Sequence, residues 1–177
     1  MVTQNPRQVF TFKPDYRIFT LRDVECDAGV GRSEAVREAN RNASACTDYE
    51  VYVACAQDLF DVSVTIETLP GEPEPGDCDF EWSRGIDYEL TCPSGELRLG
   101  DPTTYGFTVA LPDGSGVYAI RVRHAGREQA DQARNDALAN WQGTSSAAPP
   151  TSANGDAIER YLLQLWHRSP IADDDSD

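Results

Sequence analysis

Histidine is the side chain that most often acts as a general base, and the sequence contains two, His124 and His167. A catalytic histidine needs a nucleophile or carboxylate partner, and the sequence has no G-x-S-x-G motif to supply a nucleophile. Each histidine ends a strand-like run, GVYAIRVRH at 116–124 and ERYLLQLWH at 159–167. A structural role at a strand end is therefore favoured over a reactive site, and the same holds for Trp166 beside His167.

The cysteines and glycines also lack the spacing of a known site. The five cysteines form no C-x-x-C pair and no histidine stands at zinc-ligand spacing. The stretch DAGVGRS at 27–33 has neither the G-x-G-x-x-G pattern nor the G-K-[ST] ending of a phosphate loop. The closing DDDSD lacks the glycine of a calcium loop. The sequence thus predicts no cofactor, no metal site and free thiols at Cys26, Cys46, Cys55, Cys78 and Cys92.

Carboxylates are the one chemically active group present in excess. Residues 67–101 hold ten acidic residues and two arginines, a local net charge of −8. Alternation places several of these acids on the solvent side of strands, so a solvated face and a surface for a basic partner are both open interpretations. A carboxylate pair with or without a divalent metal is a further, weaker possibility. The predicted partner-binding residues are Glu67, Glu72, Glu74, Asp77, Asp79, Glu81, Asp87 and Glu89.

Composition limits the kinds of partner. The chain has 177 residues and a net charge of −15, which should repel nucleic acid and anionic membranes and attract basic proteins. A small-molecule substrate is not indicated by any motif. The first residues, MVTQNPRQVF, do not resemble a signal peptide, and no apolar run is long enough to cross a membrane. We expect a cytoplasmic protein that does not bind DNA directly.

Period-2 alternation of apolar and polar residues dominates the chain and predicts a mainly β fold, an antiparallel β-sandwich. The clearest cases are FDVSVTIE at 60–67 and IDYELTC at 86–92. The Asp-Gly turn in LPDGSG at 111–116 predicts a hairpin between the strands on either side of it. Further strands are expected at 9–12, 17–23, 49–56, 95–100, 105–111, 116–124 and 158–166.

Two short helices are expected at 33–44 and 127–141, the second with its alanines at helical spacing and Trp141 as its anchor in the core. The small and polar stretch 142–156 is typical of a flexible loop, and 69–79 of a loop stiffened by proline. We expect one domain over 1–170 and a disordered acidic tail over 171–177.

The segments GDCDFEWSRGIDYELTC, PSGELRLG, GSGVYAIRVRH and ERYLLQLW, within 77–168, carry a resemblance. In their order and spacing they resemble small bacterial β-sandwich proteins of the competence-protein J class of nuclease inhibitors and related actinobacterial proteins. The resemblance implies an antiparallel sandwich and inhibition of a nuclease by direct binding, and it assigns no catalytic residue.

Together these observations favour an acidic protein-binding module and not an enzyme, most concretely an inhibitor or immunity protein that blocks a basic nuclease or toxin. Two alternatives stay open. One is a non-catalytic subunit or regulator of a bacterial defence or phage-related complex, in which the loops at 27–48 and 142–156 make the contact. The other is a carboxylate-based, metal-dependent enzyme.

Overall fold

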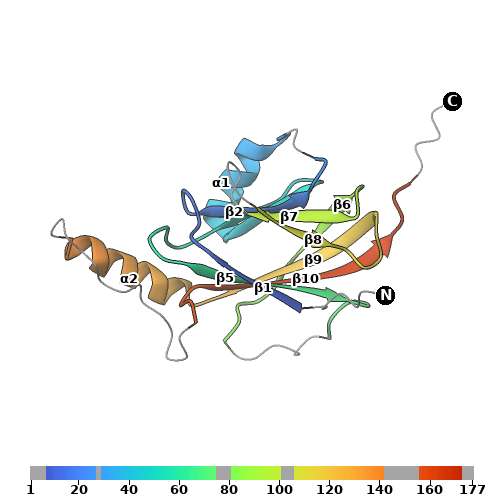
Figure 1. The fold of residues 1–177 in the computed structure, drawn as a ribbon. Helices are drawn as coiled ribbons and strands as arrows, with labels where there is room; N and C mark the ends of the chain where they lie inside the picture. Colours follow the sequence, from blue (N-terminus) through green and yellow to red (C-terminus); the bar gives the residue numbers. More distant parts are fainter. Residues whose placement is uncertain (1–6, 27–28, 75–80, 101–105, 142–155, 173–177) are drawn as a thin grey trace.

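The strands form two five-stranded sheets that pack against each other (Figure 1). The structure, a computed structural model, describes residues 7–26, 29–74, 81–100, 106–141 and 156–172. Sheet A has the order β1-β5-β10-β9-β6 and sheet B the order β3-β4-β2-β7-β8. The predicted acidic tail beyond 172 and most of the predicted loop at 142–156 lie outside the described residues. Sheet A consists of β1 (Arg7–Phe12), β5 (Val62–Leu69), β6 (Ile86–Cys92), β9 (Gly116–Ala125) and β10 (Arg160–Ser169). Sheet B consists of β2 (Ile18–Asp23), β3 (Ser44–Cys46), β4 (Glu50–Ala54), β7 (Glu96–Gly100) and β8 (Gly106–Ala110).

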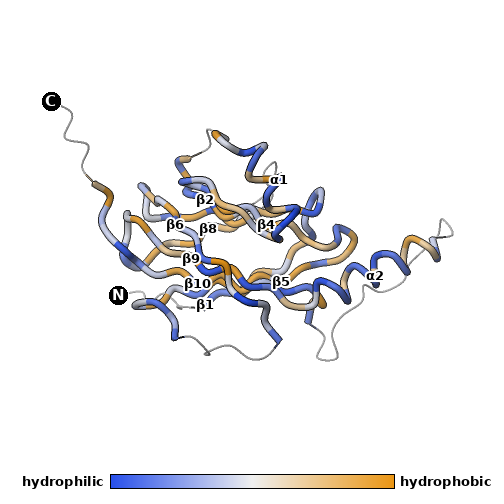
Figure 2. Tube along the Cα trace, turned by 180° about the vertical axis from the view of Figure 1, so that it is seen from behind, coloured by the Kyte–Doolittle hydropathy of each residue, from blue (hydrophilic) through white to orange (hydrophobic). Residues whose placement is uncertain are grey.

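The inner faces of the two sheets form one hydrophobic core. The alternation seen in the sequence explains this, because successive side chains of a strand point to opposite faces. In β10, Tyr161, Leu163 and Leu165 are buried in this core, and in β5 Val62, Val64 and Ile66 join them. The most hydrophobic stretches run along the strands of both layers, whereas α2 is hydrophilic over most of its length (Figure 2). The expectation of a mainly β fold is confirmed.

The pairing is mainly antiparallel, with one exception. Strands β5 and β10 run parallel, with Leu163 opposite Ile66. Parallel neighbours need a long connection, and here the whole chain between Leu69 and Arg160 lies between them.

The predicted hairpin at 111–116 is wrong. Strand β8 pairs with β7 in sheet B, and β9 pairs with β6 and β10 in sheet A. The turn does reverse the chain, with Gly114 at φ 72° and its amide bonded to the carbonyl of Leu111. This turn crosses the end of the sandwich. It is held there by the buried side chain of Leu111 and by the hydrogen bond that the Tyr118 hydroxyl donates to the carbonyl of Gly114. The chain therefore passes from sheet B to sheet A, and β8 and β9 do not pair.

Both predicted helices are present. Helix α1 (Arg32–Asn42) covers the outer face of sheet B, where Ala35 and Ala39 pack on Ala45, Tyr52 and Ala54. Small side chains on both surfaces let the helix approach closely. Among the described residues, no helix is long and apolar enough to cross a membrane.

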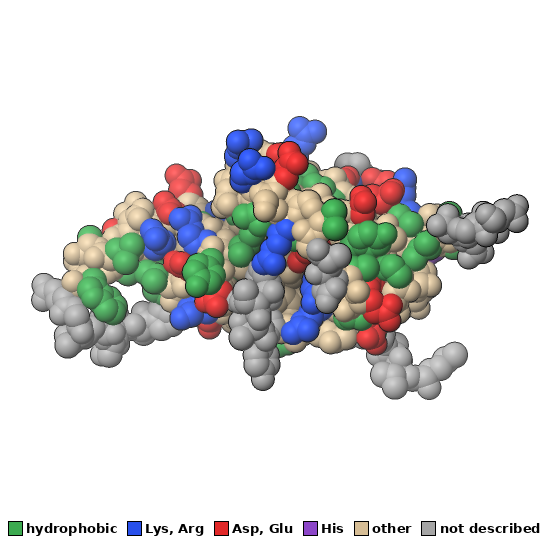
Figure 3. Space-filling model, turned by 90° about the horizontal axis from the view of Figure 1, so that it is seen from above, with side chains coloured by type: hydrophobic (Ala, Val, Ile, Leu, Met, Phe, Trp, Pro, Cys, Tyr) green, Lys and Arg blue, Asp and Glu red, His purple; other side chains and the backbone are tan. Residues whose placement is uncertain are grey.

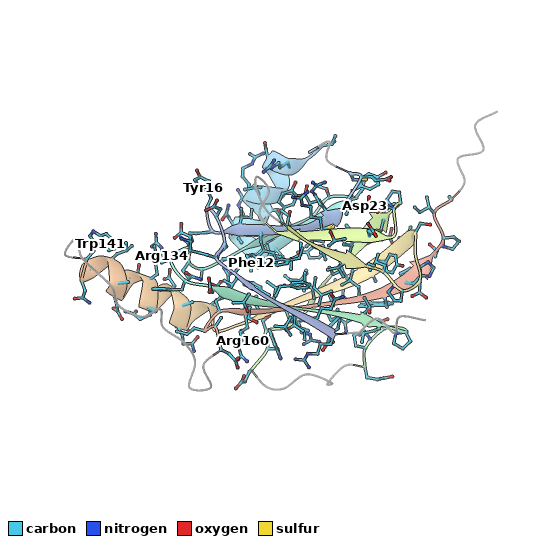
Figure 4. All side chains as sticks on the ribbon, in the orientation of Figure 1. Phe12, Tyr16, Asp23, Arg134, Trp141 and Arg160 are labelled. Atoms are coloured by element: carbon cyan, nitrogen blue, oxygen red, sulfur yellow. The ribbon has the colours of Figure 1, made fainter. Side chains whose placement is uncertain are left out.

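Helix α2 (Arg127–Ala139) projects from one end of the sandwich, and Trp141 lies at its far end (Figures 1 and 4). The predicted role of Trp141 as a core anchor is wrong, because its side chain is 65% exposed. Only Ala130 in the first turn is buried. The alanine spacing predicts the helix correctly but gives no information on the direction in which it leaves β9.

Candidate partner-binding surfaces

The connection between β5 and β6 is described at residues 70–74 and 81–85, and both of these ends contact β9 of sheet A. In its described parts, Arg121 of β9 donates to the carbonyl of Pro73 at 3.4 Å, and Arg123 to the carbonyl of Ser83 at 3.4 Å. The amide of Ser83 also donates to the carbonyl of His124 at 2.8 Å. Both described ends of this connection are therefore held against the sheet by arginines of β9, a central strand.

The outer face of β10, the strand next to β9, is also covered. Leu162, Gln164 and Trp166 alternate with the core residues of the strand, yet each is buried. The guanidinium of Arg121 lies over the ring of Trp166, 5.5 Å from its centroid. The run YLLQLW, apolar on both faces, is the sequence signal that this strand is covered on both sides.

Four of the predicted partner-binding acids form ion pairs with arginines that are distant in sequence. Arg121 binds Asp87 through two nitrogens, at 2.6 and 2.8 Å, and Glu72 at 3.1 Å. Arg160 of β10 binds Glu81 at 2.7 Å (Figure 4 shows Arg160 on this face). The fourth pair joins Glu67 to Arg7 of β1 at 3.6 Å.

The other predicted acids are placed differently. Glu74 and Glu89 are exposed and have no ion pair with a described residue. Asp77 and Asp79 lie outside the described residues. The local charge of −8 counted along the sequence is thus reduced in space by arginines from β1, β9 and β10, and charges of both signs alternate on this face.

The pairing has electrostatic consequences for both partners. The hydrogen bonds from Arg121 lower the pKa of Asp87, although burial opposes this. The same bonds raise the pKa of Arg121. The side chains of Glu72, Glu81 and Asp87 nevertheless remain 59%, 68% and 50% exposed, so each carboxylate is oriented by its arginine and still accessible.

A second acidic surface, which the sequence did not single out, is a groove between α1 and the edges of β3 and β6. We call it the α1 groove. Its cavity volume is about 730 Å³, and Glu34, Glu38 and Asp48 bring three carboxylates to it; none of the described lining residues is an arginine or lysine. The lining is otherwise apolar or uncharged. It comprises Val30, Gly31, Ala35, Asn42, Ala45, Cys46, Thr47, Ile86 and Tyr88.

The groove exists because of the way α1 packs. Its alanines contact sheet B, which turns Glu34 and Glu38, one turn apart, toward β6. On the opposite wall the hydroxyls of Tyr88 and Ser44 hydrogen-bond at 2.9 Å. Burial, followed by the charges of Asp48 and Glu50, raises the pKa of the Cys46 thiol to about 12.

Acidic and basic side chains are interspersed over the α1 side of the molecule, and hydrophobic side chains lie both at the α2 end and at the opposite end of this face (Figure 3). Leu138 and Trp141 account for large exposed apolar side chains on that end, at 48% and 65%. The α1 groove is therefore a local concentration of negative charge and not part of a uniformly acidic face.

Two buried carboxylates are fully engaged within the protein. Glu159 accepts hydrogen bonds from the amide of Ala56 at 2.6 Å, from Gln57 at 3.3 Å and from the hydroxyl of Tyr161. Asp23, at the end of β2 (Figure 4), accepts hydrogen bonds from the amide and hydroxyl of Ser94 and from the thiol of Cys92. Because their oxygens are occupied, these carboxylates join strands and are not available to a substrate.

Among the described residues, the imidazoles of the two histidines take no part in the ion pairs of sheet A and do not line the α1 groove. His167 packs edge-on against Tyr118, with ring centroids 5.3 Å apart. Burial, and secondarily the charge of Arg127, lowers the pKa of His124. Neither imidazole hydrogen-bonds another side chain in the described part of the chain, and no group of three or more histidine, cysteine or acidic side chains there is arranged to hold a metal ion. The four described cysteines are free thiols.

No protein-family model matches the sequence, and no curated protein matches it either. Among solved structures, the chain resembles ComJ of Bacillus subtilis, described as an inhibitor of the DNA-degrading activity of NucA. That match has a TM-score of 0.60 at 9% identity and covers 91% of this chain and 96% of ComJ. A protein described as crocagin biosynthetic gene J matches with a TM-score of 0.46 at 13% identity, over 94% of this chain and 97% of the other. The resemblance to the competence-protein J class expected from residues 77–168 is therefore confirmed at the level of the fold, and it extends over most of the chain.

Proposed function

We propose that this protein is a non-enzymatic, acidic protein-binding module of the cytoplasm that inhibits a basic partner, most concretely a nuclease. The observation that carries the proposal is the fold shared with ComJ over nearly the whole chain, in a protein whose net charge is −15. The identity of 9% supports the fold and leaves the partner open. Function must therefore be argued from the surface.

The acids of sheet A and its loop suit such a role physically. A nuclease binds the phosphates of DNA with arginines and lysines, and carboxylates on a rigid sheet can occupy the phosphate positions. Arg121 and Arg160 fix the orientation of Asp87, Glu72 and Glu81. Side chains that are ordered before binding lose less conformational entropy when the partner arrives.

Glu74 and Glu89 complete this surface with negative charge that no described arginine neutralises. Association through exposed charges is fast at low ionic strength and weakens as salt screens it. The proposed inhibitor should thus lose affinity as salt rises, whereas a loop-mediated subunit of a complex should not.

The test is a DNA-degradation assay in which purified protein is titrated into nucleases, beginning with NucA, the target of ComJ. We expect stoichiometric inhibition that weakens between low and high salt. A variant with Glu72→Gln, Glu74→Gln and Glu89→Gln should inhibit at least tenfold less, whereas Asp61→Asn with Asp113→Asn and Glu128→Gln, which changes the net charge equally, should inhibit like the wild type.

Equal inhibition by the two triple variants would contradict the proposed surface. Absence of inhibition of every nuclease tested, including those of the native host, would overturn the nuclease-inhibitor function.

A further inference from the structure

The three carboxylates of the α1 groove differ from Glu72, Glu81 and Asp87 of the sheet A surface, each of which is paired with an arginine. Glu34, Glu38 and Asp48 form no ion pair within the described residues. Helix α1 carries Arg32, Arg37 and Arg41, and none of them forms an ion pair with a described residue. The guanidinium of Arg37 bonds the carbonyl of Ser33. Among the described residues, the only side chain that hydrogen-bonds Glu38 is the neutral amide of Asn42, at 2.7 Å.

This arrangement is unfavourable for the isolated chain. Glu34 and Glu38 are four residues apart on the helix, a spacing at which like charges repel each other. A cation placed between them would convert this repulsion into attraction. In sheet A, by contrast, Arg121 and Arg160 pair with Asp87, Glu72 and Glu81.

The groove also offers apolar surface next to its charges. Val30 and Ile86 are 81% and 37% exposed on its rim, and the half-buried Tyr88 lies in its wall. Its volume of about 730 Å³ is in the range of ordinary ligand pockets, roughly 300–1,000 Å³. An occupant should therefore have an apolar stem and a cationic head.

We propose that the α1 groove receives an arginine side chain of the protein partner, with the guanidinium between Glu34, Glu38 and Asp48. This inference rests on the proposed function, because it assumes a basic protein partner, and it names a second contact surface for it. An arginine suits the groove better than a lysine, since its planar guanidinium binds carboxylates with two nitrogens and stacks on an aromatic ring. Its methylene stem would lie on Val30 and Ile86.

The first experiment does not need the partner. The probe is the capped tripeptide Ala-Arg-Ala, titrated into ¹⁵N-labelled full-length protein, with Ala-Lys-Ala and the uncharged Ala-Gln-Ala as comparisons. We expect amide shifts centred on Ala35, Ala45 and Tyr88, strongest for the arginine peptide and absent for the glutamine peptide. Shifts that are scattered over the surface, or that do not distinguish the charged peptides from the neutral one, would overturn the inference.

Variants show whether the carboxylates cause the binding. Glu34→Gln with Glu38→Gln and Asp48→Asn should abolish the groove shifts and should leave thermal stability equal or higher, because repulsion on α1 is removed. The charge-matched control is Asp61→Asn, Asp113→Asn and Glu128→Gln, which should retain them. Retention of the shifts by the groove variant would contradict the proposal.

The nuclease assay separates the two proposals. If the protein inhibits a nuclease and the groove variant inhibits as well as the wild type, the groove inference fails and the proposed function stands. If no nuclease is inhibited but the arginine peptide binds in the groove, the proposed function fails and the groove remains a site for an arginine.

Discussion

Replacement of Glu159 by alanine should destabilise the fold more than loss of any surface acid. Glu159 lies just before β10, and its side chain is 0% exposed. It accepts hydrogen bonds from Ala56, Gln57 and Tyr161, and the guanidinium of Arg127 lies 3.6 Å away. One carboxylate thus connects the end of sheet B, the loop before β5, the start of α2 and β10.

The expected loss is about 3 kcal/mol in the free energy of unfolding. Removing one partner of a buried ion pair typically costs 3–5 kcal/mol, because the remaining groups stay buried and unpaired. The lower end applies because Arg127 is 24% exposed and also donates to the carbonyl of Ala54 and the hydroxyl of Tyr161. Glu159→Gln should cost less, about 1.5 kcal/mol, since it keeps the shape and loses the charge that strengthens these hydrogen bonds.

Urea unfolding followed by far-UV circular dichroism measures these changes. The midpoint should fall in the order wild type, Glu159→Gln, Glu159→Ala, with the same dependence on urea concentration. Asp61→Ala, which removes an exposed acid before β5, should change stability by less than about 0.5 kcal/mol. A loss below about 1 kcal/mol for Glu159→Ala would show that the network does not hold the end of the sandwich, and the reasoning would fail.

Three further outcomes follow from single positions. Arg121→Met should lower the free energy of unfolding at neutral pH, and the difference from the wild type should shrink as pH falls below about 4. The ion pair lowers the folded-state pKa of Asp87, so the stabilisation that it provides is present above the unfolded pKa and is lost as pH falls through the folded pKa. A difference in the free energy of unfolding that stays constant down to low pH would contradict this. Gly126→Ala should destabilise strongly, because Gly126 has φ 74° and an added Cβ would lie 1.9 Å from the carbonyl oxygen of Ile158; an unchanged melting temperature would refute the turn geometry. Trp141→Ala should leave the melting temperature nearly unchanged, since the ring is exposed. A large drop in the melting temperature would indicate that Trp141 packs in the core.

Local sequence patterns predicted the elements well where one face is buried. The alternation in 60–67 and 86–92 and the closing run at 158–166 correspond to β5, β6 and β10. In β10 the alternating residues Tyr161, Leu163 and Leu165 all face the core. These predictions succeed because the period of two depends only on the pleat of the strand.

The candidate sites were predicted less completely. The excess of acid at 67–101 was visible, but Arg121, which binds Asp87 and Glu72, is 34 and 49 residues away from them. The α1 groove combines residues of α1 with Asp48 and Tyr88. No window of sequence contains such a set, so neither the neutralised acids nor the unpaired ones could be identified from charge counts.

The sequence by itself determined the mainly β character, the two helices, the core-facing side of β5 and the net charge of −15. Only the tertiary structure decided that β8 and β9 lie in different sheets, that β5 and β10 run parallel, and that α2 carries Trp141 away from the core. Hydrophobic alternation specifies which side of a strand avoids water but not which strand lies beside it. Strand neighbours, and with them the pairing of charges on a surface, are selected by packing over the whole chain.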